Sequence, residues 1–315
     1  MKRIACIACI ALLLAASLPA LAQQVADRDF VPKVSPPAHA PGKGPVVCLD
    51  EAHHNFHTLD GRFHAFGELL RRDGYVVVPN RAAFDATSLS ACAVLVIANA
   101  QPGDASWNDY PLPTPSAFAP AEIAAVRAWV QGGGRLLLIA DHMPLAGAAL
   151  ALAAAFDVGF SDGFAFAGID DAAMREPTLF RTDDGTLADH VIVRGDDAGS
   201  AVSQVRSFTG QAFRAPGAQP LMVLPAGFVS LHPAKAWDFQ PDTPRVDVGG
   251  WLQGAVKQVG KGRAAFFGEA AMFTAQSAGP QRMPVGMNAP DAEQNAQFAL
   301  NVLHWLAAGT AATPR

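Results

Sequence analysis

Short apolar runs that alternate with amphipathic stretches are the feature that most limits the folds open to this chain. Four runs have the length and apolar content of buried strands: residues 46–49, 75–78, 93–98 and 135–140. Three stretches have the apolar spacing of helices: residues 59–72, 120–132 and 145–156. Strands that alternate with helices in this way predict an α/β fold with a mostly parallel, doubly wound sheet.

The pattern weakens in the second half of the chain. From 159 to about 249, glycines separate short apolar runs such as 191–193 and 221–224, and these predict extra β structure that elaborates the same domain. A final strand is expected at 264–267. Asp291 and Gln294 have the spacing of a capping box at the start of a last helix. We therefore expect one domain over 46–309, followed by a tail over 310–315.

The first 22 residues have the layout of a secretory signal peptide. Lys2 and Arg3 precede an apolar run, and Ala20-Leu21-Ala22 is a small-residue cleavage site. The run is too short to span a bilayer comfortably. We expect cleavage after Ala22, a periplasmic or secreted protein, and no membrane insertion after signal removal. Residues 23–45 contain five prolines and few large apolar residues, so they are predicted to be an extended tether.

Charge and cysteine content narrow the function classes. The precursor has 23 basic and 28 acidic residues, and loss of Lys2 and Arg3 leaves a net charge of −7. A mildly acidic chain lacks the electrostatic footprint of a nucleic-acid-binding protein. Cys48 lies within one predicted strand and Cys92 just before another. We expect both to be small core residues, with a single disulfide between them as the alternative.

Polar residues follow the predicted strands, at the edge where open α/β sheets bind ligands. Partial burial there can separate the pKa values of carboxyl and imidazole groups, and so distinguish an acid from a base. The candidate catalytic residues are Glu51, His53, Asp141, His142 and Glu269. The candidate ligand-binding residues are Asp50, His54, Asn55, His57, Asn99, Trp107 and Tyr110.

Each candidate has a catalytic and a structural interpretation. Glu51 or Glu269 is the expected general base, and His53 or His142 the expected acid or electrostatic stabiliser. The alternative for Asp141 and Glu269 is that they cap helices. In a similar way, the two aromatic candidates form a stacking rim for a flat ligand or pin a proline-rich loop.

Familiar catalytic motifs are incomplete. Residues 50–53 spell the D-E-A-H box of helicases, but no glycine-rich phosphate loop is present, so we expect no nucleotide cofactor. His53, His57 and His142 are candidate ligands for a divalent metal, although the sequence contains no fixed-spacing metal motif. Hydrogen bonding of the loop by these histidines is the alternative. No G-x-S-x-G or G-x-C-x-G nucleophile elbow occurs in the chain.

Four sequence blocks resemble an uncharacterised bacterial family with a class I glutamine-amidotransferase-like domain: L-D-E-A-H-H-N-F-H-T, A-W-V-Q-G-G-G-R-L-L-L-I-A-D-H, G-E-A-A-M-F-T-A-Q and N-A-Q-F-A-L-N-V-L-H-W-L. The resemblance covers about 46–306. It implies a flavodoxin-like three-layer α/β/α domain, related to the domain shared by gliding-motility and intraflagellar-transport (GIFT-like) proteins, a group for which carbohydrate binding has been proposed. The amidotransferase cysteine is absent, since the strand at 136–140 runs into Asp141-His142-Met143-Pro144. Amide hydrolysis through a thioester is therefore not expected.

These observations lead to three functional hypotheses. The first is an exported hydrolase-like enzyme that acts on a glycan or glycoconjugate, because titratable residues converge from separate strand ends. The second is a non-catalytic module that binds a carbohydrate, a peptide or another small molecule. The third is a metal-dependent hydrolase.

Overall fold

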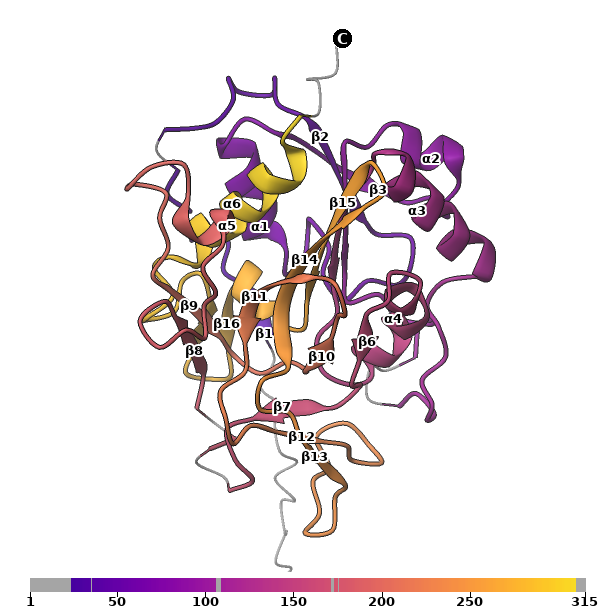
Figure 1. Ribbon diagram of the computed structural model, residues 1–315, viewed down its shortest axis with the longest axis vertical. Helices are drawn as coiled ribbons and strands as arrows, with labels where there is room; N and C mark the ends of the chain where they lie inside the picture. The colour runs from indigo at the N-terminus through magenta and orange to yellow at the C-terminus, as the bar shows by residue number, and fades with distance from the viewer. Residues whose placement is uncertain (1–23, 35, 106–108, 171–172, 175, 310–315) are drawn as a thin grey trace, which may run out of the picture.

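The computed structural model describes residues 24–309, except 35, 106–108, 171–172 and 175 (Figure 1). The predicted signal peptide, Trp107 and the tail lie outside the described residues. Within the described part, the largest sheet has nine strands. Five of them lie side by side in this order: β3 (Val76–Asn80), β2 (Val46–Asp50), β4 (Val94–Ala98), β5 (Arg135–Ile139) and β15 (Gly262–Phe267). Neighbouring strands among these five are parallel, as the sequence predicts.

The rest of this sheet is antiparallel. Strand β14 (Leu252–Val259) pairs antiparallel with β15 and extends the sheet beyond its parallel half. The outer strands are β10 (Phe213–Arg214), β6 (Gly159–Phe160) and β11 (Gln219–Val223). The sheet as a whole is therefore mixed, and the mostly parallel arrangement applies to the part built from the first half of the chain together with β15.

Helices cover both faces of the parallel strands (Figure 1). Helices α1 (His64–Arg72) and α6 (Asn295–Ala307) lie on one side; α2 (Ala86–Ser90), α3 (Pro120–Gly132) and α4 (Leu145–Ala154) lie on the other. Successive side chains of a strand point to opposite faces. Accordingly, Val47 and Leu49 pack in one apolar core with α1 and α6, whereas Cys48 packs in the second core with α3 and α4.

The second half also builds smaller elements around the main sheet. Strands β7 (Phe164–Phe166), β12 (Val229–Leu231) and β13 (Arg245–Asp247) form a separate small sheet. Two further pairings involve β8 (Thr178–Arg181) with β9 (Gln204–Ser207), and β16 (Ala275–Ala278) with β17 (Met283–Gly286). A 3₁₀ turn spans Ala271–Phe273. No helix among the described residues is both long and apolar enough to cross a membrane.

The proline-rich segment before β2 is held against the domain, which differs from the extended tether predicted for it. Strand β1 (Gln24–Ala26) pairs with β16. Phe30 and Val34 pack against the core. The His39 N–H donates to the Asp73 carbonyl. Proline removes only its own N–H, so the other residues of the segment remain able to bond the domain.

Two local predictions for the second half are wrong. Residues 191–194 form a short helix, α5 (Val191–Arg194), in place of β structure, and His190 caps it by accepting the Ile192 N–H. Helix α6 begins at Asn295 without a side-chain cap. The Gln294 side chain instead accepts N–H groups from the segment that leads into β9. Tertiary contacts of this residue replace the predicted capping box.

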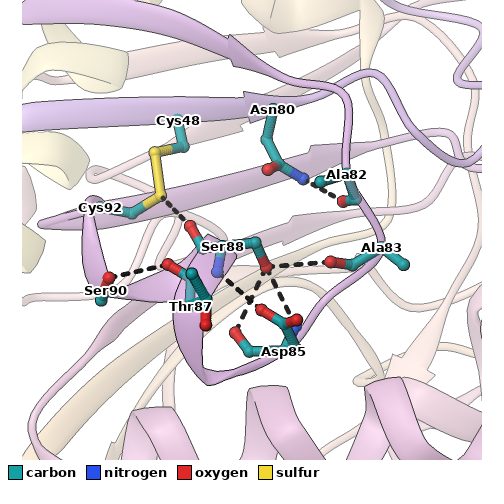
Figure 2. Close-up of a disulfide and its surroundings, with 9 residues drawn as sticks. All are labelled: Cys48, Asn80, Ala82, Ala83, Asp85, Thr87, Ser88, Ser90 and Cys92. Atoms are coloured by element: carbon teal, nitrogen blue, oxygen red, sulfur yellow. Dashed lines mark hydrogen bonds between the residues drawn. A yellow bond between two sulfur atoms is a disulfide. The ribbon is translucent and has the colours of Figure 1, made fainter.

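Cys48 and Cys92 form a disulfide (Figure 2). The expectation of two unpaired core cysteines is therefore wrong, and the alternative holds. Cys48 lies on β2, and Cys92 lies between α2 and β4, with 5.6 Å between the two Cα atoms. The pair is 44 residues apart in sequence, so its proximity follows only once β2 and β4 are known to be neighbours.

Candidate functional site

Asp141 and Glu269 follow neighbouring parallel strands at the carboxyl edge of the sheet. Ile139 at the end of β5 is the register partner of Phe267 at the end of β15. Each acidic residue comes two positions later, so the two carboxyl groups emerge at equivalent places. Asp141 is partly exposed, whereas Glu269 is buried. We call Asp141 and Glu269 the strand-end pair.

Glu269 is a buried acidic residue, and its pKa is affected by burial, by its hydrogen bonds and by the neighbouring Asp141. Its two carboxylate oxygens accept the backbone N–H groups of Ala271 at 2.6 Å and Met272 at 2.8 Å, which caps the 3₁₀ turn. Burial raises the pKa of Glu269 well above its ordinary value, and the charge of Asp141 raises it further. The two backbone hydrogen bonds oppose this shift without cancelling it. Glu269 therefore combines the capping role with a perturbed pKa.

Asn99 connects Asp141 of the strand-end pair to His57, in the histidine-rich segment that follows β2. Its side-chain oxygen accepts the Asp141 N–H at 2.8 Å, and its amide nitrogen lies 3.1 Å from His57 Nδ1. His57 is buried, and burial together with the charge of Arg62 lowers its pKa well below the ordinary value. A neutral imidazole that accepts the Asn99 amide hydrogen follows from these contacts. Asn99 thus orients both groups.

His142 follows Asp141 in the chain, and its ring contacts the aromatic rings of Phe164 and Trp237. Its Nδ1–H donates to the Met143 carbonyl at 2.8 Å, which fixes the ring orientation. The ring stacks on Phe164 with centroids 4.4 Å apart, and Trp237 meets it edge-on at 5.0 Å. Trp237 is 44% exposed and has a φ of 67°, in the left-handed region that large side chains rarely adopt. An exposed aromatic ring therefore contacts His142, the residue that follows Asp141.

Asp50, His53 and Glu122 form a separate cluster, which we call the histidine clamp. His53 Nδ1 lies 2.9 Å from both Asp50 oxygens, and its Nε2 lies 2.9 Å from Glu122 Oε1. Phe84 and Phe118 enclose the ring, with centroids 4.5 and 4.8 Å away. Burial lowers the pKa of His53, but the hydrogen bonds and charges of the two carboxylates outweigh burial and raise it. Both ring nitrogens are thereby occupied within the fold.

Glu51 and Asn55 serve the local backbone. One oxygen of Glu51 accepts the Leu59 N–H at 2.9 Å, and the other pairs with Arg81 at 3.0 Å. Asn55 accepts the His53 N–H and donates to the Ala98 carbonyl. These contacts show Glu51 engaged away from the strand-end pair, so the structure gives no support to its expected role as base.

The remaining surface candidates have local contacts. His54 is exposed and pairs with Asp104 at 2.6 Å. The Tyr110 hydroxyl donates to the Gly103 carbonyl at 2.5 Å. Tyr110 thus pins its proline-rich loop, the alternative expected for it. Trp107 is not among the described residues.

Three residues near these clusters were not predicted. Glu122 lies in α3, a helix that is recognised in the sequence by its apolar face, so no local pattern marks Glu122 as a site residue. Trp237 lies with Phe239 in an otherwise polar loop between β12 and β13, and two aromatic residues in such a loop are the signal that would have found it. Asp162 accepts the Gly147 N–H at 2.7 Å, and burial raises its pKa although nearby His142 opposes the shift. A partly buried carboxyl near His142 cannot be recognised from the spacing of Ser161-Asp162-Gly163.

The predicted metal site lacks a suitable ligand group. Among the residues that the structure describes, no three His, Cys, Asp or Glu side chains are placed to hold a metal ion. His53 contacts two carboxylates, His57 contacts Asn99, and His142 contacts the Met143 carbonyl. The three histidines proposed as ligands do not converge, and we derive no step from a metal.

Two cavities, of about 460 and 700 Å³, lie elsewhere on the molecule. The smaller lies at the amino ends of β2 and β3, and the larger lies beside α5. Neither is lined by Asp141, His142 or Glu269. We therefore place the candidate site by its chemistry, because Asp141 and Glu269 are neighbours at the carboxyl edge and the exposed ring of Trp237 contacts His142, the residue after Asp141.

Comparison with known proteins gives information on the fold. No protein-family model matches the chain, and no curated protein sequence matches it. The structure is similar to the mmIFT52 N-terminal domain, with 12% identity and a TM-score of 0.57, over 84% of this chain and 99% of that one. At this identity the similarity shows the fold alone, and at that level it agrees with the expected relation to the intraflagellar-transport domain.

Two other solved structures are similar at a lower score. A cytoplasmic protein from Salmonella typhimurium LT2 has 15% identity and a TM-score of 0.48, over 83% of this chain and 98% of that one. A ThuA-like protein from Bacteroides uniformis has 11% identity and a TM-score of 0.44, over 86% of this chain and 94% of that one.

Proposed function

We propose that the protein is an exported hydrolase that acts on a glycan or glycoconjugate at the strand-end pair. The observation that carries this proposal is the position of a buried carboxyl group, Glu269, and a partly exposed one, Asp141, at equivalent places after neighbouring parallel strands. Burial and the charge of Asp141 both raise the pKa of Glu269. Neighbouring titratable groups whose environments differ are a typical arrangement for acid–base catalysis.

The exposure of each group assigns its role. Asp141 is the accessible carboxylate, and we assign it as the general base that activates water. Glu269 is 1% exposed and is a positioning residue that acts through Asp141. The half-exposed ring of Trp237 provides an apolar surface with a polar N–H, which suits the face and hydroxyl groups of a sugar.

The proposal extends to the fold and the compartment. The order β3-β2-β4-β5-β15 corresponds to the 2-1-3-4-5 order of flavodoxin-like sheets. Together with helices on both faces, it supports a three-layer, doubly wound domain of the glutamine-amidotransferase-like kind. The signal-like first 22 residues support export, and so does the disulfide, since disulfides persist in oxidising compartments.

A glycan-retention screen followed by a turnover assay on each retained glycan tests the proposal. We expect Asp141→Asn to lower kcat by about 100-fold or more, the usual contribution of a general base, while glycan retention persists. Trp237→Ala is expected to weaken retention, and Glu269→Gln to change the pH profile of kcat/KM. The exposed Asp60→Asn is the matched control and leaves all three readouts unchanged. A retained glycan that is hydrolysed equally by Asp141→Asn contradicts the assignment.

The second candidate is a binding module without turnover. It is favoured by the burial of Glu269, His53 and His57, each of which has hydrogen-bond partners within the fold. In that case the wild-type protein retains the glycan, no product forms after long incubation, and only Trp237→Ala changes the result.

A further inference from the structure

The cavity of about 460 Å³ lies at the edge of the sheet opposite Asp141. Pro45 precedes β2, Tyr75 precedes β3, and His304 lies in the last turns of α6; all three line it. We call it the amino-edge cavity. Its volume lies within the range of sites that bind small molecules. It shares no residue with the strand-end pair.

One wall of the amino-edge cavity is the proline-rich segment that packs against the domain. The Ala38 N–H donates to Asp73 Oδ1 at 2.7 Å, and the Gly44 N–H donates to the Gly74 carbonyl at 2.9 Å. The His39 ring meets Tyr75 edge-on, with centroids 5.1 Å apart. These contacts hold the wall in place, so the cavity is a built feature of the fold.

Two buried polar side chains, Asp73 and Tyr75, line the cavity, and one of them lacks a hydrogen-bond partner among the described residues. Asp73 is fully buried, and its Oδ2 lies 2.6 Å from His304 Nε2. Tyr75 is 2% exposed, and its hydroxyl has no hydrogen-bond partner among the residues that the structure describes. A buried hydroxyl without a partner is costly, and Tyr75 lines a hollow that a ligand can enter. The unmet hydrogen bond is the observation that points to a ligand.

The lining also indicates the charge and shape of that ligand. Asp196 and Asp197 lie at the exposed rim, above the buried Asp73. Among the described lining residues there are three carboxylates and no lysine or arginine. Much of the remaining wall is apolar, for example Pro37 and Leu300. This combination suits a cation with a short aliphatic body.

We propose that the amino-edge cavity binds a small aliphatic amine. Its ammonium group donates a hydrogen bond to the Tyr75 hydroxyl oxygen, and the carboxylates of Asp73, Asp196 and Asp197 favour a positive charge in this cavity. Its methylene groups lie against the prolines and Leu300. This ligand site is separate from the proposed hydrolase site, so either assignment can fail without the other.

Isothermal titration of the full chain with 1,5-diaminopentane and n-pentylamine tests this site. We expect both amines to bind, while n-pentanoate and 1-pentanol, which have the same chain length without the cation, do not. Tyr75→Phe is expected to weaken amine binding by about 2- to 10-fold, the usual effect of one lost hydrogen bond. Tyr110→Phe is the matched control, because Tyr110 bonds its own loop and does not line the cavity. Asp196→Asn tests the rim without disturbing the buried groups.

Thermal unfolding gives a second readout. Because the Tyr75 hydroxyl lacks a partner within the described part of the fold, we expect Tyr75→Phe to raise the Tm of the free protein and to reduce the increase that the amine produces. The proposal is overturned if neither amine binds at millimolar concentration, if pentanoate binds as well as pentylamine, or if Tyr75→Phe and Tyr110→Phe bind the amines equally.

Discussion

The histidine clamp and the strand-end pair were expected to form one site, yet they behave differently. In the clamp, an imidazole lies between two carboxylates at hydrogen-bond distance. In the strand-end pair, two carboxyl groups are neighbours, and the charge of one raises the pKa of the other. The clamp joins β2 to α3, whereas the pair sits at the ends of β5 and β15.

The difference teaches that residue type does not decide the role of a polar cluster. Opposite charges stabilise each other when they are buried together, and removal of one partner leaves the other uncompensated. Like charges instead shift the proton affinity, which is useful for chemistry and unfavourable for stability. We therefore interpret the clamp as structural and the pair as the functional candidate.

Removal of the buried carboxylate of the clamp has the largest expected effect. Asp50 is 0% exposed and contacts His53 through both oxygens. We expect Asp50→Ala to lower the free energy of unfolding by about 3–5 kcal/mol, the usual result of breaking a buried ion pair. Urea unfolding measures the change. The exposed Asp60→Ala is the control, with an expected change within about 0.5 kcal/mol.

The same measurement on the strand-end pair sharpens the comparison. Asp141 is partly exposed, so Asp141→Asn is expected to change stability by less than about 1 kcal/mol, although it lowers kcat by about 100-fold or more. If Asp141→Asn destabilises the protein as much as Asp50→Ala does, the distinction between the two clusters is wrong.

Loss of the disulfide has the next largest expected effect. It ties β2, which carries Asp50, to the segment after α2 (Figure 2). Its 44-residue separation predicts that reduction lowers the free energy of unfolding by about 2–4 kcal/mol, mainly through the unfolded chain. Urea unfolding with and without dithiothreitol measures this. Dithiothreitol must have no effect on the double variant Cys48→Ala/Cys92→Ala; otherwise the loss does not arise from this bond.

Much of the first half of the fold could be predicted because its signals are local. Pro120 and Gly133 mark the ends of α3 by their own backbone preferences. The strands at 94–98 and 135–139 are apolar runs buried on both faces. The start of α6 could not be predicted in this way, because Gln294 bonds a segment about 90 residues away.

Only those residues of the candidate site that lie at the ends of predicted strands could be found from the sequence. Asp141 and Glu269 were found because each follows an apolar run. Glu122 is 69 residues from His53, and their contact depends on the way α3 packs beside β2. Strand order, which brings Cys92 to Cys48, likewise depends on the whole sheet. Spacing in the sequence contains none of this information.

The smallest expected effect concerns two buried histidines, His53 and His57, which are four residues apart. Their pKa values are shifted in opposite directions. The pKa of His53 is raised, so its stabilising contribution is full below pH 6.5 and is lost as pH rises through its folded-state pKa. The pKa of His57 is lowered, so the unfolded chain takes up a proton first as pH falls through 6.5, and stability is lost on the acidic side.

Replacement of each histidine by glutamine separates these two contributions. We expect the stability difference between wild type and His53→Gln to shrink above pH 6.5, and the difference between wild type and His57→Gln to shrink below it. Urea unfolding from pH 5 to 8 measures both, and Ile123→Val, which removes no titrating group, serves as the control with a constant difference. If both histidine variants deviate on the same side of pH 6.5, the carboxylates do not hold the proton on His53. The clamp would then be a neutral hydrogen-bond network, and its contrast with the strand-end pair would be lost.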